Sequence, residues 1–81
     1  MSRSFKILGR YAESQPRWAR GKVGTQAKKR VYTSLADFEK YAPETAQRWD
    51  EFCGYQVEAY ELIEEKWVEI QDWFEQISEG E

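Results

Sequence analysis

A stripe of large apolar side chains in the C-terminal third constrains the fold of this chain more than any other feature. Successive members of the stripe are three or four residues apart, which places them on one side of an α-helix. The stripe consists of Tyr60, Ile63, Trp67, Ile70, Phe74 and Ile77. Tyr55 and Leu62 widen it, and Gly80 suits a helix terminus. The spacing predicts a long amphipathic helix over residues 55–78.

Two shorter helices are expected before it. Ser34 is followed three residues later by Asp37, an acidic variant of the capping box, which predicts a helix over residues 35–41. Pro43 disfavours helical geometry in the residue before it and suits the first position of a new helix, over residues 43–53. The sequence thus predicts two helices separated at the proline.

Gly54 either ends the second helix or lies inside one continuous rod. A rod over residues 43–78 would be about 54 Å long, well beyond the diameter of about 30 Å expected of so small a domain. We therefore expect a break at Gly54.

The N-terminal part has the alternating pattern of β-strands. Phe5 and Ile7 flank Lys6, and Val31 and Thr33 follow a run of basic residues. We expect a short N-terminal hairpin or small antiparallel sheet, with a long loop between its strands.

Together these segments predict a single α+β domain over residues 1–81. The chain of 81 residues is too short for two hydrophobic cores. Residues 1–33 form a basic strand-and-loop region, and residues 34–81 form an acidic helical region. The expected architecture is a short β-hairpin or small antiparallel sheet, two short helices and one long C-terminal amphipathic helix. A mostly helical bundle is the alternative.

Charge is distributed very unevenly along the chain. Residues 1–30 carry nine Lys or Arg and one acid, whereas residues 31–81 carry fourteen acids and three bases. The net charge of −3 therefore hides a strongly polarised molecule. Polarity of this size bears on partners and solubility more than on the fold.

The composition excludes most catalytic and metal-binding arrangements. With no histidine and a single cysteine, Cys53, the chain cannot assemble a zinc site or a Cys–His pair. There is no glycine-rich phosphate motif, and the carboxylates fall on the exposed side of the expected helix, where nothing excludes water. We expect no enzymatic activity, no metal and no cofactor. The lone cysteine and the lack of a long apolar run predict a cytoplasmic protein with no membrane partner.

Acidic residues line the side of the expected C-terminal helix opposite the apolar stripe. They are Glu58, Glu61, Glu65, Asp72, Glu75 and Glu79. Residues 58–79 hold eight acids and only one base, Lys66, whereas a solvated helix face usually mixes both signs. Over about 33 Å of helix, these carboxylates would be nearly as closely spaced as the phosphates along one nucleic-acid strand. We expect a binding protein that occupies the basic surface of a macromolecular partner; a merely solvated face is the alternative.

In size and charge, the chain resembles some small phage-encoded inhibitors of host defence and transcription. That resemblance of type implies an inhibitor or regulator of a nucleic-acid-handling protein complex, acting by steric blockade, with nucleic-acid mimicry as one form of it.

The basic N-terminal segment is the second candidate surface. It contains Arg17, Trp18, Arg20, Lys22, Lys28, Lys29 and Arg30. Cations combined with an aromatic ring in a glycine-containing loop suit phosphate contacts and base stacking. Direct binding of nucleic acid is therefore the alternative function, and a solubilising loop is the simpler explanation of the same residues.

Self-association is a further alternative, because oppositely charged ends and a broad aromatic stripe suit a homodimer. Tyr55 and Trp73 flank the stripe. If they are exposed, they are the natural hot spots of an interface, since Trp and Tyr dominate such sites. Otherwise they complete the core.

Overall fold

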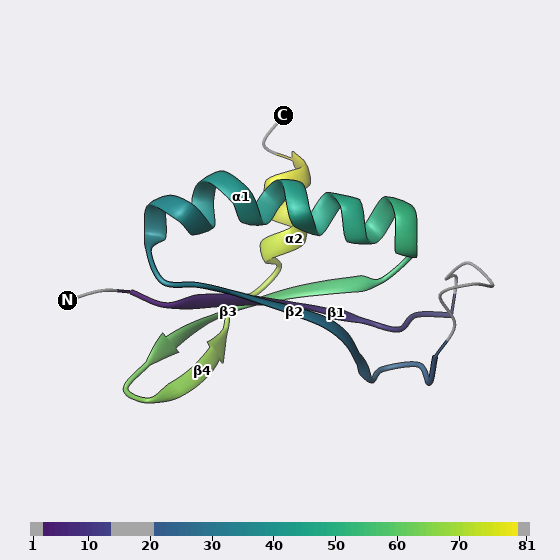
Figure 1. Ribbon diagram of the computed structural model, residues 1–81, viewed down its shortest axis with the longest axis horizontal. Coiled ribbons are helices and arrows are strands. Elements are labelled where there is room, and N and C mark those ends of the chain that lie inside the picture. Colours follow the sequence, from purple (N-terminus) through teal and green to yellow (C-terminus); the bar gives the residue numbers. More distant parts are fainter. Residues whose placement is uncertain (1–2, 14–20, 80–81) are drawn as a thin grey trace.

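The computed structural model describes residues 3–13 and 21–79, without the side chains of residues 78 and 79. It is an α+β fold in which two helices lie on one side of a four-stranded antiparallel sheet (Figure 1). The strands are β1 (Phe5–Arg10), β2 (Gln26–Tyr32), β3 (Gln56–Ile63) and β4 (Lys66–Glu69). The helices are α1 (Leu35–Arg48), which continues as the π-helical stretch η2 (Trp49–Cys53), and α2 (Trp73–Glu79).

The strand order is β2-β1-β3-β4, so β1 lies inside the sheet and pairs with both β2 and β3. Alternation along β1 turns Phe5 and Ile7 toward the helices, and both are almost fully buried. Gly9 faces the same layer, where a Cβ atom would lie 3.0 Å from Trp49 Cε3 and 3.1 Å from Tyr55 Cδ2. The absence of a side chain at Gly9 therefore lets the helix layer approach the strand.

The core fills the space between the helices and the sheet. Its centre is Phe38 of α1, whose ring stacks on Phe5 with centroids 4.4 Å apart and also contacts Tyr32 and Trp73. The buried cluster comprises Phe5, Ile7, Tyr32, Phe38, Ala42, Ala46, Val57, Ala59 and Trp73. A smaller cluster of Cys53 and Tyr55 lies at the end of η2.

Helix α1 begins where the capping pattern places it, because the Ser34 hydroxyl accepts a hydrogen bond from the backbone N–H of Asp37 at 3.1 Å. The expected break at Pro43 is wrong, since the helix runs through the proline. Ala42 and Ala46 are fully buried, and keeping them in one row requires an unbroken helix despite the missing proline N–H. The expected break at Gly54 is present, with a left-handed φ of 68°.

The long C-terminal helix over residues 55–78 is absent, and that prediction is wrong. Strands β3 and β4 form a hairpin over most of this range, and only the short α2 is helical. β3 supplies the second partner of β1, whose backbone groups on that side would otherwise be unpaired. Burial in β3 alternates, with Val57 and Ala59 buried and Gln56 exposed. A helical bundle does not fit either, because the sheet is the central element.

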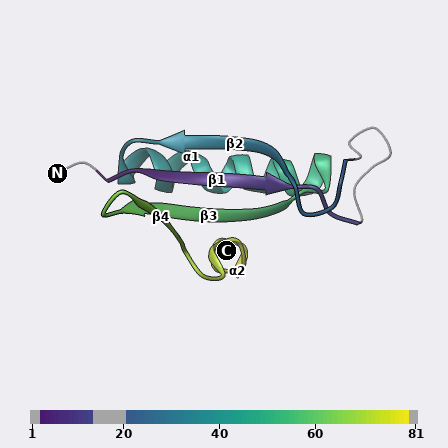
Figure 2. The same cartoon turned by 90° about the horizontal axis from the view of Figure 1, so that it is seen from below.

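One face of the sheet carries none of the helices in the described part of the chain. Figure 2 views this face directly, with β1 and β3 in its middle and α2 seen end-on beyond them. Both helices lie behind the sheet, and the β3–β4 hairpin bends away from them (Figure 1). The uncovered face and the hairpin are therefore open to solvent.

Candidate functional site

A row of polar and aromatic side chains crosses the uncovered face of the sheet. Arg10 Nε of β1 donates to Glu58 Oε1 of β3 at 3.1 Å, and the hydroxyl of Tyr60 donates to Glu58 Oε2 at 2.6 Å. Lys6 Nζ lies 5.3 Å from the ring centroid of Tyr60 and 4.6 Å from that of Trp67 on β4. These contacts tie the hairpin to β1 through cation–π and charge-assisted interactions.

Two pKa shifts follow from this row. The hydrogen bond to Glu58, followed by burial, raises the pKa of Tyr60. Burial, with the nearby charges of Lys29 and Arg10, lowers the pKa of Lys6. Both shifts follow from the packing of these side chains against one another on the sheet.

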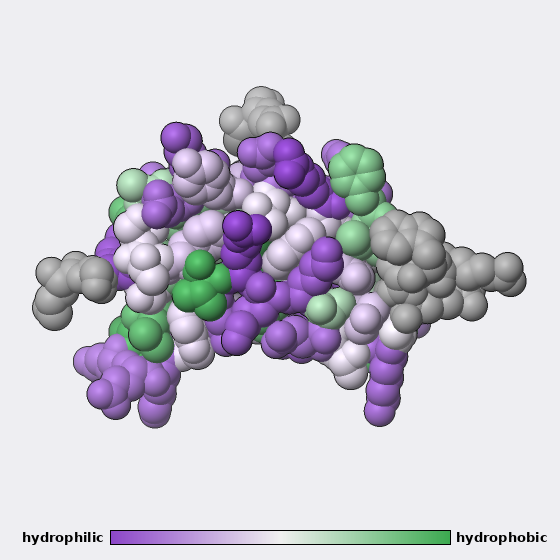
Figure 3. All heavy atoms as spheres, viewed as in Figure 1, coloured by the Kyte–Doolittle hydropathy of each residue, from purple (hydrophilic) through white to green (hydrophobic). Residues whose placement is uncertain are grey.

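The β3–β4 hairpin carries a concentration of exposed apolar side chains. Leu62, Ile63, Trp67 and Val68 are 38%, 46%, 37% and 46% exposed, and they are half of the eight large hydrophobic residues exposed in the described chain. Leu62 pairs with Trp67 on one face, while Ile63 and Val68 lie on the other. Hydrophobic atoms gather over this hairpin next to strongly hydrophilic side chains (Figure 3). Patches of this kind mark interaction surfaces in small proteins.

The tip of the hairpin is a strained acidic turn. Ile63 pairs with Lys66, which leaves Glu64 and Glu65 as a two-residue turn with φ values of 50° and 68°. Two positive φ angles define the type I′ geometry that Asn-Gly adopts most easily, and glutamate is unfavourable there. Within the described chain, neither carboxylate belongs to an ion pair.

The acidic face expected on a C-terminal helix does not exist as one surface. Glu58 and Glu61 are three residues apart on β3 and so face opposite sides of the sheet, while Glu65 lies in the turn. Asp72 precedes α2 and Glu75 lies in its first turn. Glu79 ends α2, and its side chain lies outside the described residues. The predicted acidic face depended on helical spacing, and most of this segment is not helical.

Two of these carboxylates are already paired within the chain. Arg3 Nε donates to Glu61 Oε2 at 2.8 Å, and this hydrogen bond lowers the pKa of Glu61. Glu58 is held by Arg10 and Tyr60, as described above. Glu58 and Glu61 are therefore less available to a partner than Glu64 and Glu65 at the tip.

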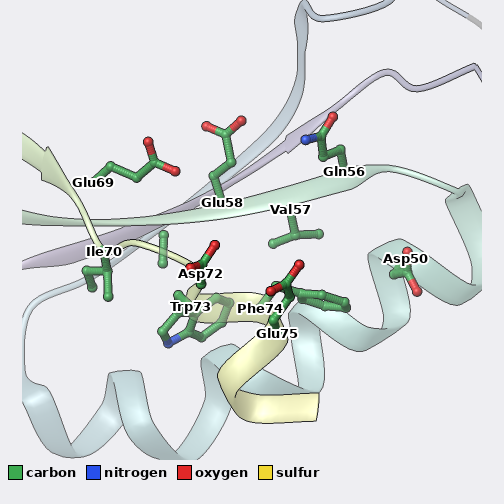
Figure 4. A pocket seen from close by; sticks show the side chains of 11 residues that line it. Asp50, Gln56, Val57, Glu58, Glu69, Ile70, Asp72, Trp73, Phe74 and Glu75 are labelled. Atoms are coloured by element: carbon green, nitrogen blue, oxygen red, sulfur yellow. The ribbon is translucent and has the colours of Figure 1, made fainter. Parts of the chain in front are cut away.

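A hollow of about 270 Å³ lies between β3 and α2. Figure 4 shows its lining: Glu58 and Glu69 point away from α2, whereas Asp72 and Glu75 lie at the start of that helix. Because these carboxylates diverge, they do not form a metal site, and no group of metal-ligating side chains occurs among the described residues.

The two aromatic residues proposed as interface hot spots are buried. Tyr55 is 7% exposed and packs edge-on against Tyr11, with ring centroids 5.6 Å apart. Trp73 is 8% exposed and packs against Phe38 at 5.4 Å. Burial raises the pKa of the Tyr55 hydroxyl. Both residues complete the core and do not offer a surface.

The structure places part of the basic segment on one edge of the sheet. Lys28, Lys29 and Arg30 are consecutive exposed residues of the edge strand β2, and Lys22 is exposed in the turn before it. Arg17, Trp18 and Arg20 lie outside the described residues. The basic and acidic parts of the sequence therefore become opposite edges of one sheet, β2 on one side and the β3–β4 hairpin on the other.

Sequence reasoning missed the hairpin residues and the role of Lys6. The apolar pairs 62–63 and 67–68 flank Glu64 and Glu65, which is a hairpin signal, but the turn lacks the Asn or Gly that usually marks a tight turn. The 3–4 spacing of the same apolar residues then favoured a helix.

Comparison with known protein families, with curated proteins and with solved structures gives no match. Among the described residues, no helix is both long and apolar enough to span a membrane.

Proposed function

We propose that this protein is a non-enzymatic binding protein that docks its β3–β4 hairpin on a protein partner and acts by occupying that surface. The observation that carries the proposal is the concentration of exposed apolar side chains at residues 62–68. A chain with so small a core gains nothing from leaving Leu62, Ile63, Trp67 and Val68 in water, whereas an interface buries them.

The hairpin indicates the chemistry of the partner. Its apolar sides require an apolar cleft, and the unpaired carboxylates of Glu64 and Glu65 at its tip favour basic side chains at the rim of that cleft. Basic grooves of this kind are common in proteins that handle nucleic acid. Blockade of such a groove is the inhibitory mechanism that we propose.

Contacts between the hairpin and β1 support this use. The cation–π contacts of Lys6 with Tyr60 and Trp67 hold β4 against the body of the sheet, so its apolar side chains are preorganised for docking. A preorganised element loses little conformational entropy on binding, which raises the affinity that a given contact area can supply.

The test compares a double variant with a single-substitution control in a capture experiment. Tagged wild-type protein is exposed to nuclease-treated lysate, and the recovered protein is then titrated against each variant. Ile63→Ser with Val68→Ser removes apolar area from one side of the hairpin, without touching the core. At about 1 kcal/mol for each half-exposed side chain, the affinity should fall by about 30-fold.

Val23→Ser is the matched control, because Val23 is 56% exposed and lies in the β1–β2 connection. It should leave the affinity unchanged. Equal capture by the hairpin variant and the control would refute docking through this hairpin.

A further inference from the structure

A groove with three cations and an exposed aromatic ring runs between the edge strand β2 and the α1–η2 helix. Lys28 and Arg30 line it from β2, and Arg48 lines it from the last turn of α1. The ring of Phe52 in η2 lines the same hollow of about 290 Å³ and is 65% exposed. We infer that this groove binds single-stranded nucleic acid, with the three cations on phosphates and Phe52 stacked on a base.

The spacing of the cations suits a strand of phosphates. Lys28 and Arg30 are two residues apart on β2, so their side chains leave the same face of the strand about 7 Å apart. Each can therefore contact a different phosphate, while Arg48 reaches the chain from the opposite wall. Arg48 pairs with Glu44 at 2.8 Å, but this pair is more than 60% exposed on both sides and so contributes little. A phosphate can displace it.

Phe52 decides between nucleic acid and an acidic peptide as the ligand. Cations on an edge strand suit either ligand, since an acidic peptide could extend the sheet at β2. Phe52, however, makes no ring contact within the described chain, and it is the most exposed large apolar side chain there. An aromatic face beside cations is the arrangement that stacks bases, and a peptide strand added to β2 would leave it unused.

The acidic β3–β4 hairpin does not prevent this binding. In the order β2-β1-β3-β4, the edge strands are three strand spacings apart, which is about 14 Å. Surface charges that far apart are largely screened at physiological ionic strength, where the Debye length is about 8 Å. The groove and the hairpin are therefore independent surfaces, and the proposal for either one can hold without the proposal for the other.

The experiment measures the binding of a fluorescein-labelled oligothymidylate of about 12 nucleotides by fluorescence anisotropy over a series of salt concentrations. For single strands, log K falls with log salt by about 0.7 for each phosphate contact. Lys28→Ala with Arg30→Ala should therefore reduce the slope by about 1.4. Phe52→Ala should weaken binding about tenfold and leave the slope unchanged, because stacking releases no counterions.

Two controls match these variants. Lys66→Ala removes an exposed cation from the opposite edge strand, and Ile63→Ser with Val68→Ser removes exposed apolar area from the hairpin. Neither should change binding of the oligonucleotide. Thermal unfolding verifies that each variant is folded.

Three results would overturn the inference. The first is no binding by the wild type even at low salt. The second is an equal loss of salt dependence in Lys66→Ala, which would place the contacts elsewhere. The third is binding of polyglutamate that competes with the oligonucleotide together with no effect of Phe52→Ala, which would identify the groove as a site for acidic peptides.

Discussion

Replacing the strained turn of the β3–β4 hairpin by Asn-Gly should stabilise the protein. Glu64 and Glu65 both have positive φ angles, 50° and 68°. A residue with a Cβ atom loses about 1–2 kcal/mol in this left-handed region, whereas glycine adopts it freely and asparagine tolerates it. Glycine also gives the unfolded chain more conformational freedom, which offsets about 0.5–1 kcal/mol of this gain in stability. The double variant Glu64→Asn, Glu65→Gly should therefore gain about 1 kcal/mol in free energy of unfolding.

The assay is thermal and urea unfolding of the double variant beside a matched control. A gain of about 1 kcal/mol raises the melting temperature by about 4–8 °C for a domain of this size. Glu64→Gln with Glu65→Gln removes the same two charges and keeps the unfavourable φ angles, so its stability should stay within about 0.5 kcal/mol of the wild type.

Two outcomes would refute this reasoning. If the glutamine control gains as much stability as the Asn-Gly variant, charge repulsion and not backbone strain destabilises the turn. If neither variant gains stability, the turn is not strained. Under the proposed function, both variants should bind the partner more weakly, because both lack the tip carboxylates. Strain retained at a surface that binds is a known pattern in proteins.

Three further predictions concern the core and the surface ion pair between Arg3 and Glu61. Phe38→Ala should lower the free energy of unfolding in urea by about 3–5 kcal/mol, because the Phe38 ring packs on three other rings. Phe52→Ala should lower it by less than about 0.5 kcal/mol, and similar losses in the two variants would contradict the assigned core. Gly9→Val should cost about 1–3 kcal/mol, because its Cβ would press on Trp49, and unchanged stability would show that the helix layer can shift. The Glu61 carboxyl should titrate by NMR below its usual pKa, and Arg3→Ala should raise that pKa. Because the folded pKa is depressed, this pair stabilises the fold above the unfolded pKa of glutamate and is lost as the pH falls through the folded value; an unchanged Glu61 pKa in the variant would rule the pair out.

Local signals in the sequence predicted local features correctly. Ser34 caps α1 because its hydroxyl needs only a backbone N–H three residues away. Gly54 ends the helix because it is free to take a positive φ. The alternation of Phe5 and Ile7 marks a strand because successive side chains in a strand point to opposite faces.

The candidate surfaces were predicted only in part. The basic residues of β2 were singled out by their charge alone, but the groove also needs Arg48 and Phe52, which lie about twenty residues away in the sequence and on a different element. The acidic residues were expected on one side of a helix, so their carboxylates were grouped by helical spacing. In the sheet, the same residues fall on different faces, in a turn and at a helix start.

By itself, the sequence determined the separation of charge, the absence of histidine chemistry, the helix start at Ser34 and the helix end at Gly54. The structure decided that one helix runs through Pro43, because Ala42 and Ala46 are buried together in the core. Only the tertiary structure decided the conformation of residues 55–78, because apolar residues three and four apart satisfy both a helix and a hairpin followed by a short helix. The choice falls to the hairpin because β1 has a second side of backbone hydrogen-bonding groups that needs a partner strand. That requirement comes from residues about fifty positions away, and no local pattern can contain it.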